Sequence, residues 1–98
     1  MHTLTAAALA AAVAALFVQA RGDHDTLRAG QAAFDRVCKR CHGAEARGDA
    51  APRLVPFSRE YDEVLGIVRE GAGQMPPISA RELSDENVAD IVAYLKSL

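Results

Sequence analysis

The stretch Cys38-Lys39-Arg40-Cys41-His42 decides how the rest of this chain is interpreted. It places two thiols three residues apart, with an imidazole directly after the second. On a helical turn, positions i, i+3 and i+4 lie on one face, so all three side chains can reach a single object. The pattern is typical of covalent haem attachment, in which the thiols bind the vinyl groups and the imidazole binds iron. The sequence therefore predicts one haem c, bound by Cys38, Cys41 and His42.

The chain has room for one domain and few residues for a large core. Its 98 residues carry 11 Lys and Arg against 13 Asp and Glu, a net charge of −2. No basic stripe is present, which argues against nucleic acid as a partner. Tryptophan is absent and aromatic residues make up only 5%. A domain with so small a core usually needs a disulfide, a metal or a cofactor to stabilise its fold. A haem supplies apolar surface, whereas a disulfide between Cys38 and Cys41 would close almost no loop.

The first twenty residues are predicted to be a signal peptide. Residues 6–18 form an unbroken apolar run, which is short for a membrane span of about 20 residues. We expect cleavage after Ala20, export to the periplasm and a mature domain of residues 21–98. The residues before the apolar run contain no Lys or Arg. A membrane tether formed by an uncleaved leader and an ordinary N-terminal helix are the alternatives.

The mature chain is predicted to be all-α, and its first helix is expected over residues 26–37 with Asp25 as a possible N-cap. Gly30 in the helix interior costs about 0.5–1 kcal/mol relative to alanine. It suggests close approach by another helix, although a merely tolerated glycine fits the spacing as well. The apolar face of this helix consists of Leu27, Gly30, Phe34 and Val37.

Two more helices are expected after loops rich in glycine and proline. Ser58 is expected to cap a helix over residues 59–70 that ends at Gly71. The last helix follows Ser84, an N-cap with acidic residues in the first turn. Its apolar stripe has the spacing i, i+3, i+4, i+7 and consists of Val88, Ile91, Val92 and Leu95.

The second axial ligand of the iron has two candidates in the mature chain, His24 and Met75. His24 lies in a polar segment, where a ligand is hard to hold rigidly. Met75 lies in a loop, and Pro76 and Pro77 restrict the backbone directly after it. We therefore expect His42 and Met75 to be the metal ligands. Such an iron has no open coordination position, which favours one-electron transfer over ligand binding or catalysis.

The chain as a whole resembles a class I c-type cytochrome of the small bacterial type. The resemblance covers residues 26–98 and rests on Gly30-x-x-x-Phe34-x-x-x-Cys38, Cys41-His42-Gly43, Ala51-Pro52-Arg53-Leu54, Gly73-Gln74-Met75-Pro76-Pro77 and Val92-Ala93-Tyr94-Leu95. It implies the cytochrome c fold, in which three to four helices wrap around one haem. The first and last helices would cross, with Gly30 and Phe34 against Tyr94 and Leu95.

The resemblance also implies roles for residues around the haem. The carbonyl of Pro52 is expected to accept a hydrogen bond from the second imidazole nitrogen of His42. Leu54 would pack on the histidine side of the haem. The expected protein is a periplasmic monomer and not an enzyme. It would meet redox partners transiently, such as a dehydrogenase, an oxidase or a membrane cytochrome complex.

Other functions fit parts of the sequence. A thiol–disulfide oxidoreductase would use Cys38 and Cys41, but that chemistry normally sits on a βαβ scaffold. A zinc site would need His24 to complete its ligands. A gas sensor or a peroxidase-like site is open if Met75 does not bind iron. A subunit of a periplasmic dehydrogenase or oxidase complex is barely separable from a free electron shuttle.

Electron transfer is expected through the haem edge that carries the thioethers, near Gln74 and Pro77. A basic trio on the other side could steer an acidic partner toward that edge. An ordinary solvated surface explains the same charges. The trio consists of Lys39, Arg40 and Arg47.

Overall fold

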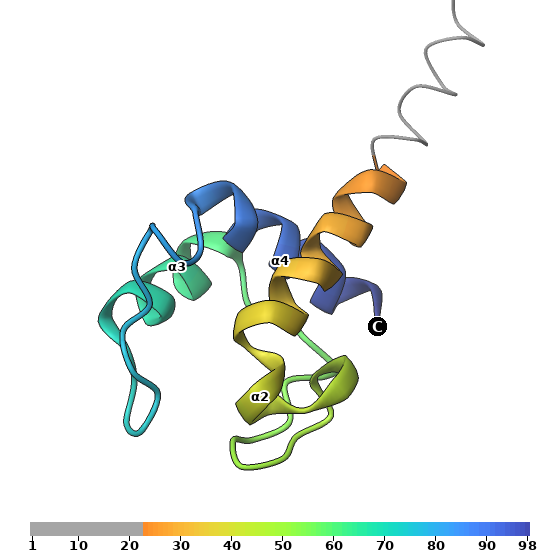
Figure 1. Cartoon of the computed structure of the whole chain (residues 1–98). Coiled ribbons are helices and arrows are strands. Elements are labelled where there is room, and N and C mark those ends of the chain that lie inside the picture. Colours follow the sequence, from red (N-terminus) through yellow and green to blue (C-terminus); the bar gives the residue numbers. More distant parts are fainter. Residues whose placement is uncertain (1–22) are drawn as a thin grey trace, which may run out of the picture.

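The computed structural model describes residues 23–98, and the leader expected at residues 1–20 lies outside this range. Residues 23–37 are helical and are called the N-terminal helical segment. The further elements are α2 (Lys39–His42), η1 (Ala44–Ala46), α3 (Tyr61–Glu70) and α4 (Asp85–Ser97). Figure 1 shows their arrangement. Over the described range there is no β-strand beyond an isolated bridge between Ala72 and Met75, so the all-α prediction is confirmed.

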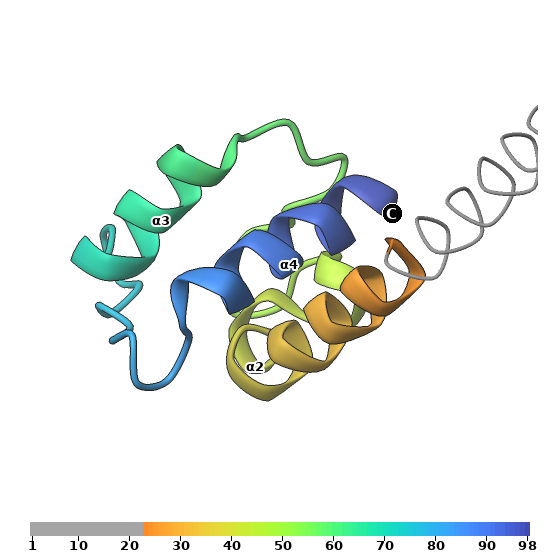
Figure 2. The same ribbon diagram turned by 90° about the horizontal axis from the view of Figure 1, so that it is seen from above.

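The N-terminal helical segment crosses α4, as predicted (Figures 1 and 2). A Cβ added at Gly30 would collide with the carbonyl oxygen of Asp90 and lie 2.8 Å from Cβ of Tyr94. Phe34 is fully buried, and its ring centroid lies 5.8 Å from that of Tyr94 at an interplanar angle of 52°. The glycine therefore marks a true close approach between two helices. The alternative of a glycine that is merely tolerated at this position is therefore excluded.

Ser84 caps α4 as expected, and Asn87 is its partner in the cap. The backbone N–H of Asn87 donates to the Ser84 hydroxyl, and the backbone N–H of Ser84 donates to the Asn87 side chain, both at 3.0 Å. This reciprocal capping box satisfies two donors at the helix start. The predicted stripe of Val88, Ile91, Val92 and Leu95 is buried.

Two other predicted caps are wrong. Asp25 lies inside the helix, because residues 23–25 are already helical and an N-cap needs a non-helical backbone. Ser58 does not cap α3, which begins at Tyr61 after an extended Glu60 whose side chain makes no capping bond. The Glu60 carboxylate instead accepts from Lys96 Nζ of α4 at 2.9 Å. The end of α3 at Gly71 agrees with the prediction.

Helices α3 and α4 run antiparallel and are tied at both ends (Figure 2). Lys96 pairs with Glu60 at the start of α3, and Arg69 near its end pairs with Asp85 in the first turn of α4 at 2.7 Å. Exposed ion pairs contribute about 0–1 kcal/mol each. Their value here is that they fix the register of the two helices.

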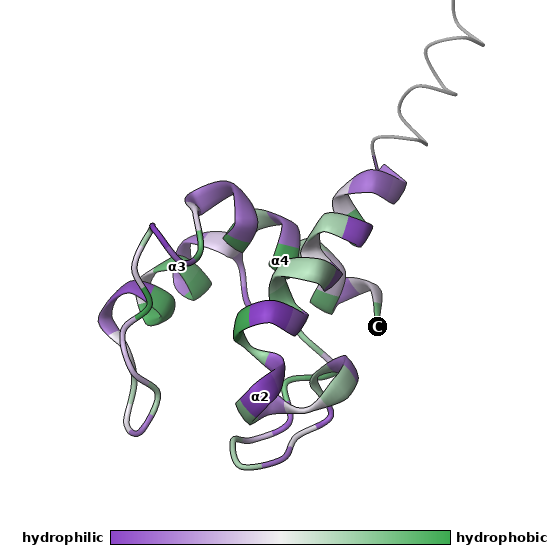
Figure 3. Ribbon diagram, in the orientation of Figure 1, coloured by the Kyte–Doolittle hydropathy of each residue, from purple (hydrophilic) through white to green (hydrophobic). Residues whose placement is uncertain are grey.

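The buried core lies where the N-terminal helical segment, α4 and the end of α3 meet. Figure 3 shows hydrophobic stretches of α3 and α4 next to hydrophilic helix ends. None of the helices in residues 23–98 has the length and apolar character needed to cross a membrane. The buried apolar residues are Ala33, Phe34, Ala46, Val68, Ile78, Leu83, Val88, Ile91, Val92, Tyr94 and Leu95.

Candidate functional site

The two thiols and the imidazole lie on one helical turn, as the motif predicts. Cys38 is the N-cap of α2, and the backbone N–H groups of Cys41 and His42 both donate to its carbonyl, at 3.2 and 3.0 Å. Cys38 is partly buried and packs against the core, whereas Cys41 is exposed. The turn therefore presents one thiol at the protein interior and one at the surface, with His42 beside them.

The loop after α2 folds back beneath this turn. Ala51 N–H donates to the carbonyl of Cys41 at 2.8 Å, and Gly48 N–H donates to that of His42 at 2.7 Å. These bonds satisfy carbonyls that a helix end leaves unpaired. Ala46 is fully buried at the centre of the loop, and its carbonyl accepts from Leu54 N–H at 2.9 Å. The burial of Ala46 could not be predicted from the sequence, because residues 43–52 have no apolar periodicity.

The imidazole of His42 is oriented by the hydrogen bond that the resemblance implied. Its Nδ1 lies 2.9 Å from the carbonyl oxygen of Pro52. A carbonyl can only accept, so Nδ1 carries the proton of this bond, and in the neutral imidazole the lone pair is then on Nε2. Metal-binding histidines commonly have this arrangement, which fixes both the tautomer and the ring orientation.

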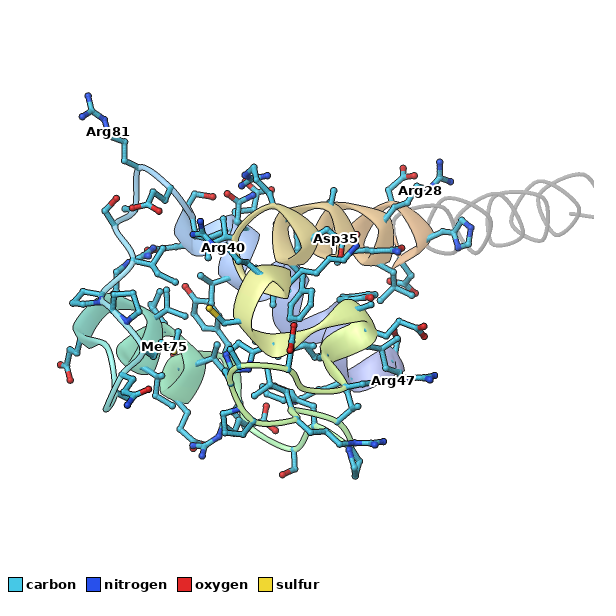
Figure 4. The ribbon with its side chains drawn as sticks, turned by 60° about the horizontal axis from the view of Figure 1, so that its bottom comes forward. Arg28, Asp35, Arg40, Arg47, Met75 and Arg81 are labelled. Atoms are coloured by element: carbon cyan, nitrogen blue, oxygen red, sulfur yellow. The ribbon has the colours of Figure 1, made fainter. Side chains whose placement is uncertain are left out.

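Met75 lies at the end of a tight turn that follows α3. Ala72 and Met75 exchange two backbone hydrogen bonds, of 3.1 and 2.9 Å, and Gly73 between them has φ of 57°. Met75 is partly buried and packs against the core. Its loop lies across from α2 in Figure 1, and Figure 4 places Met75 on the α3 side of the molecule. Met75 and α2 thus come from opposite sides of the fold.

Partly buried apolar side chains border the core on both of these sides. They touch the core and still keep exposed surface, an arrangement that a large apolar group would complete. Together with the two thiols, the oriented imidazole and the thioether, they make a donor set and lining that fit a haem. The side chains are Val37, Cys38, Leu54, Val55, Phe57, Tyr61, Val64, Leu65 and Met75.

The environment of Cys38 does not suit thiol–disulfide exchange. Burial raises the pKa of the Cys38 thiol to about 11, with Cys41 adding to the rise and Arg36 opposing it. Nucleophilic cysteines need a lowered pKa, because the thiolate is the reactive form. The alternative of a thiol–disulfide oxidoreductase therefore lacks both the expected scaffold and an activated thiol at Cys38.

The remaining candidates do not join the site. His24 is exposed in the N-terminal helical segment. Within residues 23–98 no three His, Cys, Asp or Glu side chains are grouped to hold a metal ion, so the zinc alternative lacks a ligand set. The basic trio is divided: Arg47 lies well apart from Arg40 in Figure 4 and is 3.6 Å from Glu45, while Lys39 and Arg40 are exposed on α2.

The geometry described above is that of a c-type cytochrome, and the comparisons with known proteins agree. A family model described as "Cytochrome C oxidase, cbb3-type, subunit III" matches residues 25–95, and the chain belongs to this family of c-type cytochromes. It therefore carries covalently bound haem c with its iron and transfers electrons. Two further relatives are named as subunits of redox complexes, a cbb3-type oxidase and a bc1 complex.

Relatives include small cytochromes and a subunit of a large complex. "Cytochrome c-553-like" of Synechocystis is 35% identical over 80% of this chain and 71% of its own length. "Cytochrome c-555" of Methylococcus capsulatus is 32% identical over 96% and 79%. "Cbb3-type cytochrome c oxidase subunit CcoP" of Rubrivivax gelatinosus is 30% identical over 78% of this chain but only 27% of its own length. No solved structure gives a significant match.

Proposed function

We propose that this cytochrome is a periplasmic one-electron carrier, not an enzyme, whose haem iron has His42 and Met75 as axial ligands. Thioethers to Cys38 and Cys41 attach the haem. Bound haem supplies the ferric/ferrous couple, and the residues of this chain hold it and exclude competing ligands. The observation that supports the ligand set most strongly is the 2.9 Å hydrogen bond between His42 Nδ1 and the Pro52 carbonyl. It leaves Nε2 free to bind a metal.

Met75 is proposed as the second ligand because its backbone is restrained and its side chain is partly buried. Two backbone hydrogen bonds close its turn, and the side chain is neither fully buried nor free in solvent. A thioether at the sixth position closes the iron to gases and peroxide and raises the reduction potential. The gas sensor and the peroxidase-like site would require that position to be open.

Leu54 is proposed to pack on the histidine side of the haem. It lies two residues after Pro52, is partly buried, and contacts the core. Its backbone N–H is anchored to Ala46 at 2.9 Å. The same loop therefore supplies the carbonyl that orients His42 and an apolar side chain that covers the ring beside it.

The periplasmic location is proposed from the apolar run of residues 6–18, with cleavage after Ala20. A leader retained as a tether would keep the same domain at the membrane surface. N-terminal sequencing of the protein isolated from cells separates the two, because only the cleaved form begins at Arg21.

A second candidate is a cytochrome subunit of a dehydrogenase or oxidase complex. The matching family model carries an oxidase subunit description, which favours it. Free shuttles make small and transient contacts, whereas subunits have large permanent interfaces. Purification at moderate salt decides between them: a shuttle leaves the column alone, and a subunit brings the same partner chains in fixed proportion.

Intact mass and redox titration of the exported protein test the proposed attachment and chemistry. The chain is expected to gain the mass of one haem and to titrate as a single one-electron couple. The variant Cys38→Ala/Cys41→Ala should lack the added mass. A haem that stays covalently bound in this variant would contradict the assignment of both cysteines.

A further inference from the structure

We propose that Arg69 is a positioning residue that keeps Met75 at the iron by clamping the loop behind it. The loop concerned is residues 72–78, called the methionine segment. The proposal rests on the proposed role of Met75 as axial ligand. Arg69 lies in the last turn of α3, and its side chain is only 24% exposed.

The guanidinium of Arg69 joins three parts of the fold at once. Nη1 donates to the carbonyl of Ile78 at 3.1 Å, at the end of the methionine segment. Nη2 donates to Oδ1 of Asp85 in the first turn of α4, at 2.7 Å. A planar group with separate donors can hold two partners in fixed directions, which the single ammonium of a lysine does less well.

Ile78 is thereby held through both of its backbone groups. Its N–H donates to the carbonyl of Val68 at 2.7 Å, and its carbonyl accepts from the neighbouring Arg69. Only Pro76 and Pro77 lie between Ile78 and Met75, and their rings restrict φ. When Ile78 is held in place, the backbone of Met75 therefore has little freedom to move.

The other end of the methionine segment is closed by the turn between Ala72 and Met75. Met75 thus lies between a backbone turn and the Arg69 clamp. Loss of the clamp removes a hydrogen bond from a charged donor, which is stronger than a bond between neutral groups. The consequence is a larger population in which Met75 has left the iron and another ligand can bind.

Displacement of Met75 by added imidazole measures this population directly. Imidazole is titrated into the oxidised holoprotein, and loss of the weak long-wavelength band of methionine-ligated haem is followed. Arg69→Met should raise the apparent affinity for imidazole about tenfold, the effect expected when one hydrogen bond from a charged donor is lost. Arg69→Lys, which keeps the charge, should restore part of the wild-type resistance.

Lys96→Met is the matched control. It removes the ion pair at the opposite end of the same two helices and touches no residue of the methionine segment. It should leave imidazole affinity within twofold of the wild type. This separates positioning from a general loss of α3–α4 contact.

The outcomes separate the ligation by Met75 from the positioning role of Arg69. A wild-type protein without the long-wavelength band overturns the proposed Met75 ligation itself. A wild-type protein with the band, and Arg69→Met no more sensitive to imidazole than Lys96→Met, overturns the positioning role alone. If Arg69→Met does not accumulate with haem, Arg69→Lys against Lys96→Met gives the same comparison.

Discussion

At Gly30 the N-terminal helical segment touches the backbone of α4 without a side chain between them. An alanine there would drive its Cβ into the carbonyl of Asp90, and neither helix backbone can yield locally. We expect Gly30→Ala to lower the free energy of unfolding by about 1–3 kcal/mol, as overpacking does. Denaturant unfolding of the oxidised holoprotein measures the loss.

Gly66 provides the control for this substitution. It lies inside α3, it is exposed, and an added Cβ would meet nothing within 4 Å. Gly66→Ala should therefore stabilise the protein by about 0.5–1 kcal/mol through helix propensity alone. Equal effects at the two positions would mean that the helices do not cross at Gly30.

Residue types with strict local requirements were predictable from the sequence. Gly30 and Ser84 were recognised because a helix interior disfavours glycine and a helix start favours serine. Arg69 was not recognised, because its partners Ile78 and Asp85 lie beyond a loop. Nothing in the sequence near Arg69 distinguishes a clamp from a solvated arginine.

At the scale of elements, α2 presents Lys39 and Arg40 to solvent beside the exposed Cys41. If these cations steer an acidic redox partner, Lys39→Ala/Arg40→Ala should lower the association rate severalfold at low ionic strength. Salt should abolish the difference, because charges separated by more than about 10 Å are screened at 0.1 M. Stopped-flow reduction by the partner at two salt concentrations measures it.

An unchanged rate at low salt would show that Lys39 and Arg40 are ordinary surface. Arg47→Ala is the matched control, since Arg47 lies apart from α2 and is already paired with Glu45. It should have little effect on association. The predicted trio is thus reduced by the structure to a pair.

The course of the helices was better predicted than their starts. Apolar spacing identified the packed faces of the N-terminal helical segment and α4, because burial imposes the helical period. The caps Asp25 and Ser58 were wrong, because several polar residues near each start could serve. Helix α3 begins at Tyr61, directly after Glu60, which pairs with Lys96, and the local sequence did not indicate this position.

At the scale of the whole molecule, the buried core is small, and partly buried apolar residues surround it. Apolar residues just before α2, in the 54–57 segment, on α3 and in the methionine segment are only partly buried. Blocking attachment with Cys38→Ala/Cys41→Ala should leave the chain largely unfolded, with most of its far-ultraviolet helical signal lost. Lys39→Ala/Arg40→Ala, which changes the two residues between the thiols, should keep both haem and helix.

A fully helical protein without haem would show that the polypeptide core is stable alone, and it would contradict the view that the fold depends on bound haem. The fold class was predictable because one motif named the cofactor and the helix order matched it. The arrangement of the loops around the site was not, because residues 43–54 and 71–78 have no periodicity. Their hydrogen bonds to α2 and α3 appear only in three dimensions.

Met75 is proposed to be the second iron ligand beside His42. The most direct measurement is the absorption spectrum of the oxidised, exported protein, compared between wild type and Met75→Ala. The wild type should show the weak long-wavelength band of methionine-ligated ferric haem, and Met75→Ala should lack it while keeping covalent haem. Absence of the band in the wild type, or its persistence in Met75→Ala, would contradict the ligand set and leave the sixth position to another group.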